Sequence, residues 1–168
     1  MYACWNCKEI NMALGRRCIF SRLSTVCDKY NINRSDVTLI GGGAAVFYYL
    51  RTSTSDIDVT LDSDVFDQII ADRQIEPTWI PPLGECPGMW MFTLSNVDFH
   101  RSITVTKNYR NHRHFKIQPK IDLLRYKIAL GRDKDIPDLY ALESVWCILD
   151  IFERKALTKI LENQHECI

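Results

Sequence analysis

The segment from residue 37 to residue 62 constrains the fold of this chain more than any other. It begins with the apolar run VTLI, continues through three glycines at 41–43 and a helix-like run at 44–50, and ends with the alternating run DIDVTL at 56–61. Short runs rich in β-branched residues that stop at glycines are typical of strands, and alternation favours a strand as well. We therefore expect two strands joined through a glycine turn and a short helix.

Asp56 and Asp58 stand one residue apart in the second of these strands. Side chains alternate between the faces of a strand, so the two carboxylates project from one face about 7 Å apart, while Ile57 and Val59 point into the core. Two like charges in this arrangement repel unless a cation lies between them or both are solvated. Because Mg²⁺ prefers oxygen ligands, the pair predicts a divalent metal site that takes Mg²⁺ or Mn²⁺.

The three glycines directly before the helix suggest a second ligand. Without a Cβ, Gly41, Gly42 and Gly43 allow backbone amides to approach a ligand closely. A helix that starts at Ala44 would add free N–H groups and its dipole, which together favour an anion. A phosphate held beside Mg²⁺-binding carboxylates is the arrangement used in phosphoryl and nucleotidyl transfer. Each feature alone is common, but all of them in one compact unit are specific.

This unit resembles the signature of the nucleotidyltransferase fold superfamily, the DNA polymerase β-like group, which pairs a GG or GS turn with a DxD strand. It is especially similar to small bacterial and phage-type members, including toxin-type and minimal nucleotidyltransferases, in which "GG…A" leads into "T.DID"; residues 54–59 read TSDIDV. The resemblance implies an α/β (α+β) fold with a mixed sheet flanked by helices. It also implies an enzyme that uses Mg²⁺ to move an NMP group from an NTP, such as ATP, to an acceptor.

A second stretch, LLRYKIALGRDKDIPDLYAL at 123–142, resembles a family segment in which a helical lysine precedes "R.KD..D…L". The matching positions are Lys127, Arg132, Lys134, Asp135 and Asp138. The resemblance implies that Lys127 neutralises the triphosphate, since a fixed cation beside developing charge is how electrostatic catalysis works. An equally weighted interpretation is a helix–turn–helix with a salt-bridged turn.

The family generally needs a third carboxylate on a neighbouring strand, and Asp98 is the candidate in this chain. It lies in a predicted strand that follows the DID strand, and His100 two residues on makes the same face polar, which suits a cleft. Three carboxylates would hold two Mg²⁺ ions and activate an acceptor hydroxyl. Asp62, Asp64 and Asp67 are rivals, but they fall at the start of a predicted helix. The alternative for Asp98 is an exposed polar position on a strand.

The resemblance thus implies a complete set of site residues. The implied catalytic residues are Asp56, Asp58, Asp98 and Lys127, with the three aspartates as metal ligands; the implied nucleotide-binding residues are Gly41, Gly42, Gly43, Thr54, Ser55 and Lys127.

Two positions depart from the family pattern. Relatives often carry an arginine four residues before the first aspartate, where this chain has Thr52, and Arg51 comes one residue earlier. Many also carry a serine after the first glycines, where this chain has Gly43 and Ala44. We therefore expect the phosphates to be held by backbone amides and by the hydroxyls of residues 52–54, and reduced activity or an altered nucleotide preference stays open.

The rest of the chain is predicted to be one domain over residues 1–168, with a helical segment at 1–36, a sheet core at 37–118 and a helical C-terminal third at 119–168. Periodicity and turn residues predict helices at 14–30, 63–73, 119–130, about 135–149 and 151–163, strands at 89–94 and 97–105, a loop at 79–88 and a polar stretch at 106–118.

Composition limits the partners and the location. Lys plus Arg and Asp plus Glu each number 21, so a net charge of zero argues against a general nucleic-acid coat but allows a local basic patch. No run approaches the ~20 apolar residues of a membrane span, and the start of the chain lacks a secretory signal pattern. Seven cysteines at irregular spacing favour reduced thiols and a cytoplasmic location. The sequence says nothing about the oligomeric state.

Two weaker patterns remain. Residues 107–116, KNYRNHRHFK, interleave cations with aromatic rings and would suit RNA or a nucleotide, although a solvated polar loop is the slightly favoured interpretation. Cys4 and Cys7 form a CxxC, and zinc would need His165 and Cys167 to complete four ligands. Free thiols are the favoured interpretation there.

The leading hypothesis is a Mg²⁺-dependent nucleotidyltransferase whose acceptor is RNA (a tRNA end, for example), a protein side chain or an antibiotic-like small molecule. The alternative is a non-catalytic module that keeps the fold for nucleotide sensing or partner binding. A third hypothesis, an interaction protein in which the DID sequence is incidental, is disfavoured by the compactness of the unit.

Overall fold

The computed structural model describes residues 13–84, 86–102, 109–142 and 151–162. Its strands are β1 (Val37–Leu39), β2 (Asp58–Leu61), β3 (Thr78–Ile80), β4 (Met89–Leu94), β5 (Val97–Arg101), β6 (Arg110–His112) and β7 (Phe115–Ile117). Its helices are α1 (Arg16–Tyr30), α2 (Gly41–Phe47), α3 (Ser63–Arg73), α4 (Lys120–Leu130), α5 (Ile136–Ala141) and α6 (Ile151–Glu162), with 3₁₀ turns η1 (Arg34–Asp36) and η2 (Asp133–Asp135).

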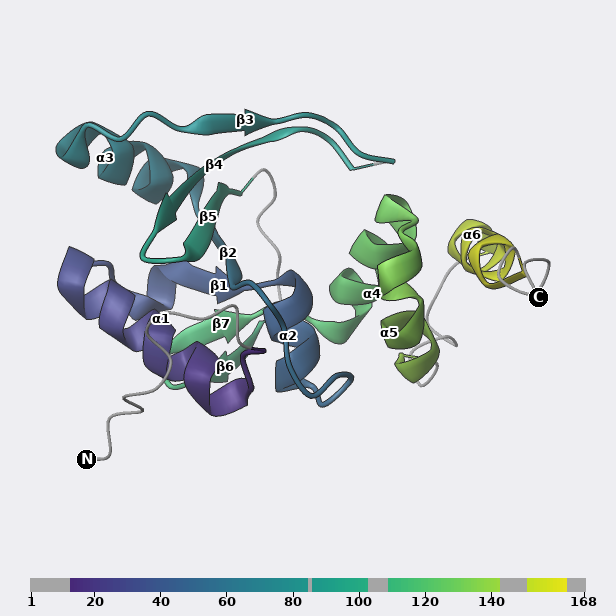
Figure 1. The fold of residues 1–168 in the computed structure, drawn as a ribbon. Helices are drawn as coiled ribbons and strands as arrows, with labels where there is room; N and C mark the ends of the chain where they lie inside the picture. Colours follow the sequence, from purple (N-terminus) through teal and green to yellow (C-terminus); the bar gives the residue numbers. More distant parts are fainter. Residues whose placement is uncertain (1–12, 85, 103–108, 143–150, 163–168) are drawn as a thin grey trace.

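The described strands form one mixed sheet in the order β3-β4-β5-β2-β1-β7-β6 (Figure 1). β5 runs parallel to β2 and β7 runs parallel to β1, while the other neighbouring pairs are antiparallel. The helices α4, α5 and α6 lie together to one side of the sheet, and α4 contacts α2, α5 and α6. The predicted α/β (α+β) class with a mixed sheet is confirmed.

Register fixes which residues share a face of the sheet. Leu39 pairs with Val59 and with Ile117, and Val59 pairs with Phe99, so these four side chains line one face, where all are fully buried. The alternate positions face the other way. There Asp58 pairs with Asp98, and β2 and β5 continue with more polar side chains. The two faces therefore divide into a core face and a polar face.

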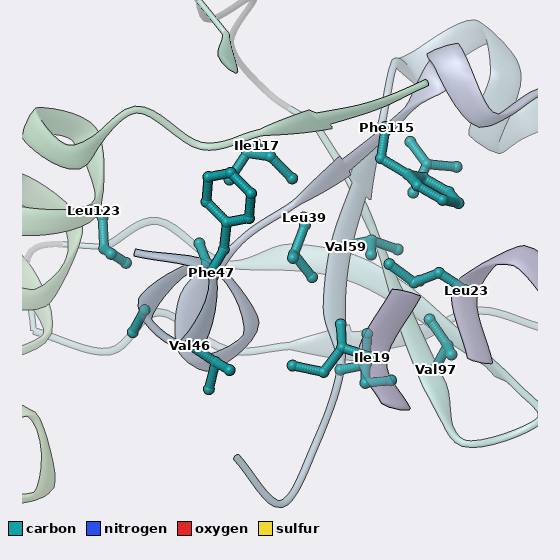
Figure 2. Close-up of a cluster of buried hydrophobic side chains, with 14 of the residues drawn as sticks. Ile19, Leu23, Leu39, Val46, Phe47, Val59, Val97, Phe115, Ile117 and Leu123 are labelled. Carbon is teal, nitrogen blue, oxygen red and sulfur yellow. The ribbon is translucent and has the colours of Figure 1, made fainter. Parts of the chain in front are cut away.

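The core face is filled by the helices around it. α1 contributes Ile19 and Leu23 at helical spacing, and α2 contributes Val46 and Phe47 (Figure 2). From α3, Phe66 packs its ring 4.9 Å from that of Phe92. Burial of an apolar stripe of this kind is what stabilises helices of this length.

Several predicted boundaries were wrong. The helix predicted at 44–50 begins at Gly41 and ends at Phe47, so the glycines form its first turn rather than preceding it. β2 begins at Asp58, which leaves Asp56 before the strand. Within the predicted loop 79–88, Trp79 and Ile80 belong to β3, whose register against β4 holds them in a hairpin despite the prolines that follow.

The polar stretch predicted at 106–118 contains a second hairpin, β6–β7, which pairs with β1 through β7. Its turn residues Arg113 and His114 both have positive φ, which sequence patterns seldom reveal outside Asn and Gly. Towards the C-terminus, α4 and α6 match the predicted helices within a residue. Of the helix predicted at 135–149, the described part is η2 followed by α5, and residues 143–150 lie outside the described ranges.

Within the described residues, no helix has the length and apolar character that a membrane crossing requires. The predictions for Cys4 and Cys7, and for residues 103–108, fall outside the described residues.

The approach of α2 to β1 gives a prediction about stability. A Cβ added to Gly43 would lie 2.6 Å from Leu39 Cδ1, which is buried in the core. Gly43→Ala should therefore lower the free energy of unfolding, because overpacking costs about 1–3 kcal/mol while the better helix propensity of alanine returns at most about 1 kcal/mol.

Urea unfolding of a double-mutant cycle tests this. Leu39→Ala alone should cost about 2–5 kcal/mol, as core truncations do. In the Leu39→Ala background the clashing methyl group is gone, so Gly43→Ala should be neutral or stabilising. Simple addition of the two single costs would contradict the contact.

Candidate functional site

A cavity of about 230 Å³ opens where the glycine turn, the residues before β2, the β3–β4 hairpin and the α4–η2 segment meet. It is lined by Ile40, Gly41, Gly42, Arg51, Asp56, Asp58, Ile80, Pro81, Leu83, Cys86, Pro87, Met89, His100, Tyr126, Lys127, Leu130, Arg132, Lys134 and Asp135. Residues from both family-like stretches, far apart in the sequence, thus line one cleft.

The glycine turn lies close to Asp58 and to Thr54. Gly41 has φ +56°, a conformation that favours glycine, and a Cβ there would lie 3.3 Å from Asp58 Oδ2. A Cβ on Gly42 would lie 2.4 Å from Thr54 Oγ1. A side chain at position 41 would therefore displace Asp58, and one at position 42 would displace Thr54.

The three glycines do not play the same part. The Gly41 N–H donates to Gln118 Oε1 at 3.2 Å, and Gly43 is buried against Leu39 and does not line the cleft. α2 is only seven residues long. Gly41 and Gly42 are the two glycines at the cleft, and their close approach to Asp58 and Thr54 explains why glycine is needed.

Asp56 and Asp58 both line the cleft, although Asp56 lies before β2 and not in the strand as the alternation predicts. Asp56 is exposed, and its Oδ1 accepts a hydrogen bond of 3.0 Å from the buried Thr54 hydroxyl. Asp58 Oδ1 lies 3.3 Å from His100 Nε2. Each carboxylate therefore has one oxygen in contact with a neighbouring side chain.

Asp98 is aligned with Asp58 in the parallel register of β2 and β5. Its carboxylate, however, accepts a hydrogen bond of 2.6 Å from Thr93 on β4, and Asp98 is not among the residues that line the cleft. Two residues further along β5, His100 lines it instead. A role for Asp98 as third metal ligand stays a prediction.

Lys127 is fully buried at the inner end of the cleft. Its Nζ lies 2.5 Å from Asp135 Oδ1 and 2.8 Å from Asp138 Oδ2. Charged side chains are almost never buried unless they are paired, and both partners here are buried as well. The salt-bridged turn and the cleft lysine, which were alternative interpretations of the sequence, are thus the same arrangement.

Two arginines complete this cluster. Arg51 donates two hydrogen bonds to Asp138, one of them from Nε to Oδ1 at 2.9 Å, and Arg132 Nε donates to Asp135 Oδ2 at 2.7 Å. Three cations therefore face two carboxylates, and all three cations line the cleft. This part of the cleft carries a positive excess, and the pair Asp56 and Asp58 supplies negative charge to the same cleft.

The charges affect the titration of Asp135. Burial raises its pKa, but hydrogen bonds and charge from Arg132 and Lys127 outweigh burial and leave the pKa below its ordinary value. Asp135 is therefore ionised at neutral pH and keeps its partners in place.

The remaining predicted residues lie nearby but not in the cleft. Thr54 supports Asp56 from behind, and Ser55 is exposed beside it without lining the cavity. Sequence reasoning missed Arg51 as a cleft residue, because it is displaced by one residue from the expected position. It also missed the β3–β4 hairpin, whose prolines indicated a loop.

The described part of the basic stretch has a different arrangement from a stacking loop. Phe115 is fully buried, and His112 packs its ring 4.6 Å from that of Phe20. Lys116 Nζ lies 5.3 Å from the Tyr109 ring centre, and Arg110 lies over Phe47. The aromatic rings thus serve the fold, while the cations stay at the surface or half-buried.

Across the described residues, no group of three or more His, Cys, Asp and Glu side chains has the geometry of a metal site. Comparison of the chain with protein-family models, curated proteins and solved structures found no match. The function of the protein is therefore inferred from the cleft and its residues.

Asp58→Asn should weaken the binding of Mg²⁺ or Mn²⁺ severely, because it removes one negative charge and one oxygen ligand from the pair. Isothermal titration measures this. The matched control is Asp64→Asn, which makes the same change at an exposed position in the first turn of α3 and should leave metal binding unchanged. Equal binding by the Asp58→Asn protein would exclude the metal site.

Asp135→Asn should destabilise the fold at pH 7 by about 3–5 kcal/mol, the usual cost of breaking a buried ion pair. Its lowered pKa means that the unfolded chain takes up the proton first, so this contribution is present above the unfolded pKa of about 3.9 and is lost as the pH falls towards the folded value.

Urea unfolding between pH 7 and pH 3 checks both statements. The wild-type protein should lose more stability on acidification than the Asp135→Asn variant. Asp67→Asn is the control, because it breaks a surface pair with Arg101 and should change stability little. Parallel pH profiles for wild type and Asp135→Asn would contradict the assignment.

Proposed function

We propose that this protein is a Mg²⁺-dependent nucleotidyltransferase that transfers an NMP group from an NTP to an acceptor. One observation carries the proposal: Gly41 and Gly42, the pair Asp56 and Asp58, and Lys127 line one cleft. Nucleotidyl transfer needs these three functions together, which are close approach of backbone to phosphates, oxygen ligands for a divalent ion and a fixed cation.

The carboxylate pair fits a Mg²⁺ ion. Asp56 and Asp58 offer hard oxygen donors, and each has one oxygen anchored by Thr54 or His100, which orients the other. When bound, Mg²⁺ supplies charge neutralisation at the α-phosphate and lowers the pKa of an acceptor hydroxyl.

The cationic end of the cleft suits the triphosphate. Arg51, Lys127 and Arg132 are held by buried carboxylates, so their positions are fixed before a ligand arrives. A preorganised cation loses little entropy on binding and stabilises charge as it develops on the leaving group. The negative end at Asp56 and the positive end at Lys127 would thus orient the NTP along the cleft.

The reaction follows from this orientation. The acceptor hydroxyl oxygen attacks the α-phosphorus and forms a new P–O bond, while the bond from the α-phosphorus to the bridging oxygen breaks and pyrophosphate leaves. The proton of the hydroxyl passes to solvent. Lys127 and the two arginines stabilise the negative charge that gathers on the pyrophosphate.

A second cavity of about 190 Å³ adjoins the cleft and gives a place for the acceptor. Ile40, Cys86, Pro87, Met89 and Tyr126 line both cavities. An acceptor group in the second cavity would therefore be separated from the first by no more than these five side chains. RNA, protein and small-molecule acceptors remain the candidates.

One observation favours the non-catalytic alternative. The Asp98 carboxylate is engaged with Thr93, and Lys127 is engaged with two carboxylates. A module that binds a nucleotide without catalysing a reaction does not need Asp98 or Lys127 beside the phosphates.

The deciding experiment incubates the protein with each α-³²P-labelled NTP, Mg²⁺ and either total RNA, lysate protein or a small-molecule extract. We expect label transfer from at least one NTP to one acceptor class, and loss of transfer by at least about 10²-fold in Asp58→Asn, since a group that stabilises the transition state is commonly worth that much. The Asp64→Asn control should transfer normally. Saturable NTP binding without transfer to any acceptor would establish the non-catalytic alternative.

A further inference from the structure

His100 is a cleft residue for which the reaction described above gives no role beyond its contact with Asp58. It lies on β5 with 8% of its surface exposed, and it lines the cavity. Its Nε2 is 3.3 Å from Asp58 Oδ1. A carboxylate oxygen only accepts hydrogen bonds, so in the tautomer with a proton on Nε2 the ring donates a hydrogen bond to Asp58.

The position of His100 on the sheet makes this contact specific. His100 pairs with Thr60 across β2 and β5, which places it diagonally beside Asp58 on the same face. Asp98, which pairs with Asp58, gives its carboxylate to Thr93. The neighbouring strand therefore presents an imidazole to the cleft beside Asp58, where a site with three carboxylates would present an acid.

A second observation supports a functional role for the His100 ring. His100 Nδ1 is buried and has no hydrogen-bond partner within the described part of the chain. An unsatisfied buried polar atom destabilises a fold, and the exceptions that persist concentrate at functional positions. A leucine or methionine would fill the same space without this cost.

We propose that His100 is the positioning residue of the metal site. By donating to Asp58 it holds that carboxylate towards the cleft, and it occupies the place of a third carboxylate, so that the nucleotide-free protein takes up one divalent ion rather than two. The inference rests on the proposed metal site at Asp56 and Asp58 and adds its stoichiometry and its supporting residue.

Charge in the cleft supports a single ion. The two carboxylates of Asp56 and Asp58 balance one dication, and the hydrogen bond from His100 adds no negative charge. Four cations, on Arg51, Lys127, Arg132 and Lys134, line the same cavity, and they outnumber the carboxylates Asp135 and Asp138 that pair with them, so the positive excess opposes a second dication. A further ion would enter only together with the phosphates of a nucleotide.

Titration of Mn²⁺ into the nucleotide-free protein at a fixed pH of about 8, followed by the electron paramagnetic resonance of free Mn²⁺, tests the proposal. The wild-type protein should bind one Mn²⁺. His100→Leu should weaken binding about 10-fold or more, as loss of a residue that orients a metal ligand usually does. His100→Gln keeps an N–H donor and should stay within about 3-fold of wild type.

His100→Glu should gain a second Mn²⁺, since it places a third carboxylate in the cleft. His114→Asn is the control, because His114 is exposed in the β6–β7 turn with φ +71°, which asparagine tolerates, and it should bind as wild type does. Thermal unfolding of each variant shows whether it is folded, and the Gln and Glu variants keep the test valid if the Leu variant is not.

Four outcomes would overturn the proposal. They are two Mn²⁺ ions on the wild-type protein, unchanged binding in His100→Leu, tighter binding in His100→Leu, and a loss in Asp98→Asn as large as that in Asp58→Asn. If the wild-type protein still transfers label in any of these cases, the proposed function stands while the role of His100 falls. No Mn²⁺ binding by the wild-type protein would remove both.

Discussion

The buried ion pairs around Lys127 connect α4, η2 and α5 with the segment between α2 and β2. Lys127 is on α4, Asp135 ends η2, Asp138 is on α5, and Arg51 belongs to the segment between α2 and β2. A low-dielectric interior makes each of these charges costly alone and strongly attracted to its partners. Together with the packing of Leu123, Leu124 and Leu139 in the core, these ion pairs hold α4 and α5 beside the segment that leads into Asp56, where the cleft lies.

The same cluster lies close to the glycine turn. A Cβ on Gly42 would lie 2.4 Å from Thr54 Oγ1 and 3.7 Å from Arg51 Nη1. The segment from Arg51 to Asp58 thus lies close to α2 and is bound to α5 through the ion pair of Arg51 with Asp138. This close approach requires residues without a side chain at positions 41 and 42.

Much of this was predictable from local pattern. The DID strand, the amphipathic α1 and the helix around Lys127 follow from periodicity, since burial of one face dictates spacing directly. The short first strands of two hairpins, β3 and β6, were not predictable, because they have three residues each and are held as strands by their neighbours. The contact of His100 with Asp58 depends on register between strands about forty residues apart, and that of Asp98 with Thr93 on register within the β4–β5 hairpin, so only the polar character of their face was visible beforehand.

The two parallel pairings have a consequence for how the chain assembles. β1 pairs with β7, whose residues follow it by almost eighty positions, and β2 pairs with β5 across about forty. Contacts between distant segments slow folding, because the chain between them must close into a loop before the contacts can stabilise the protein. During synthesis β1 lacks its second neighbour in the sheet until Ile117 has left the ribosome, and the ion pairs at the cleft cannot form before Asp138. Until then the hydrogen-bonding edge of β1 is available to chaperones and to other nascent chains.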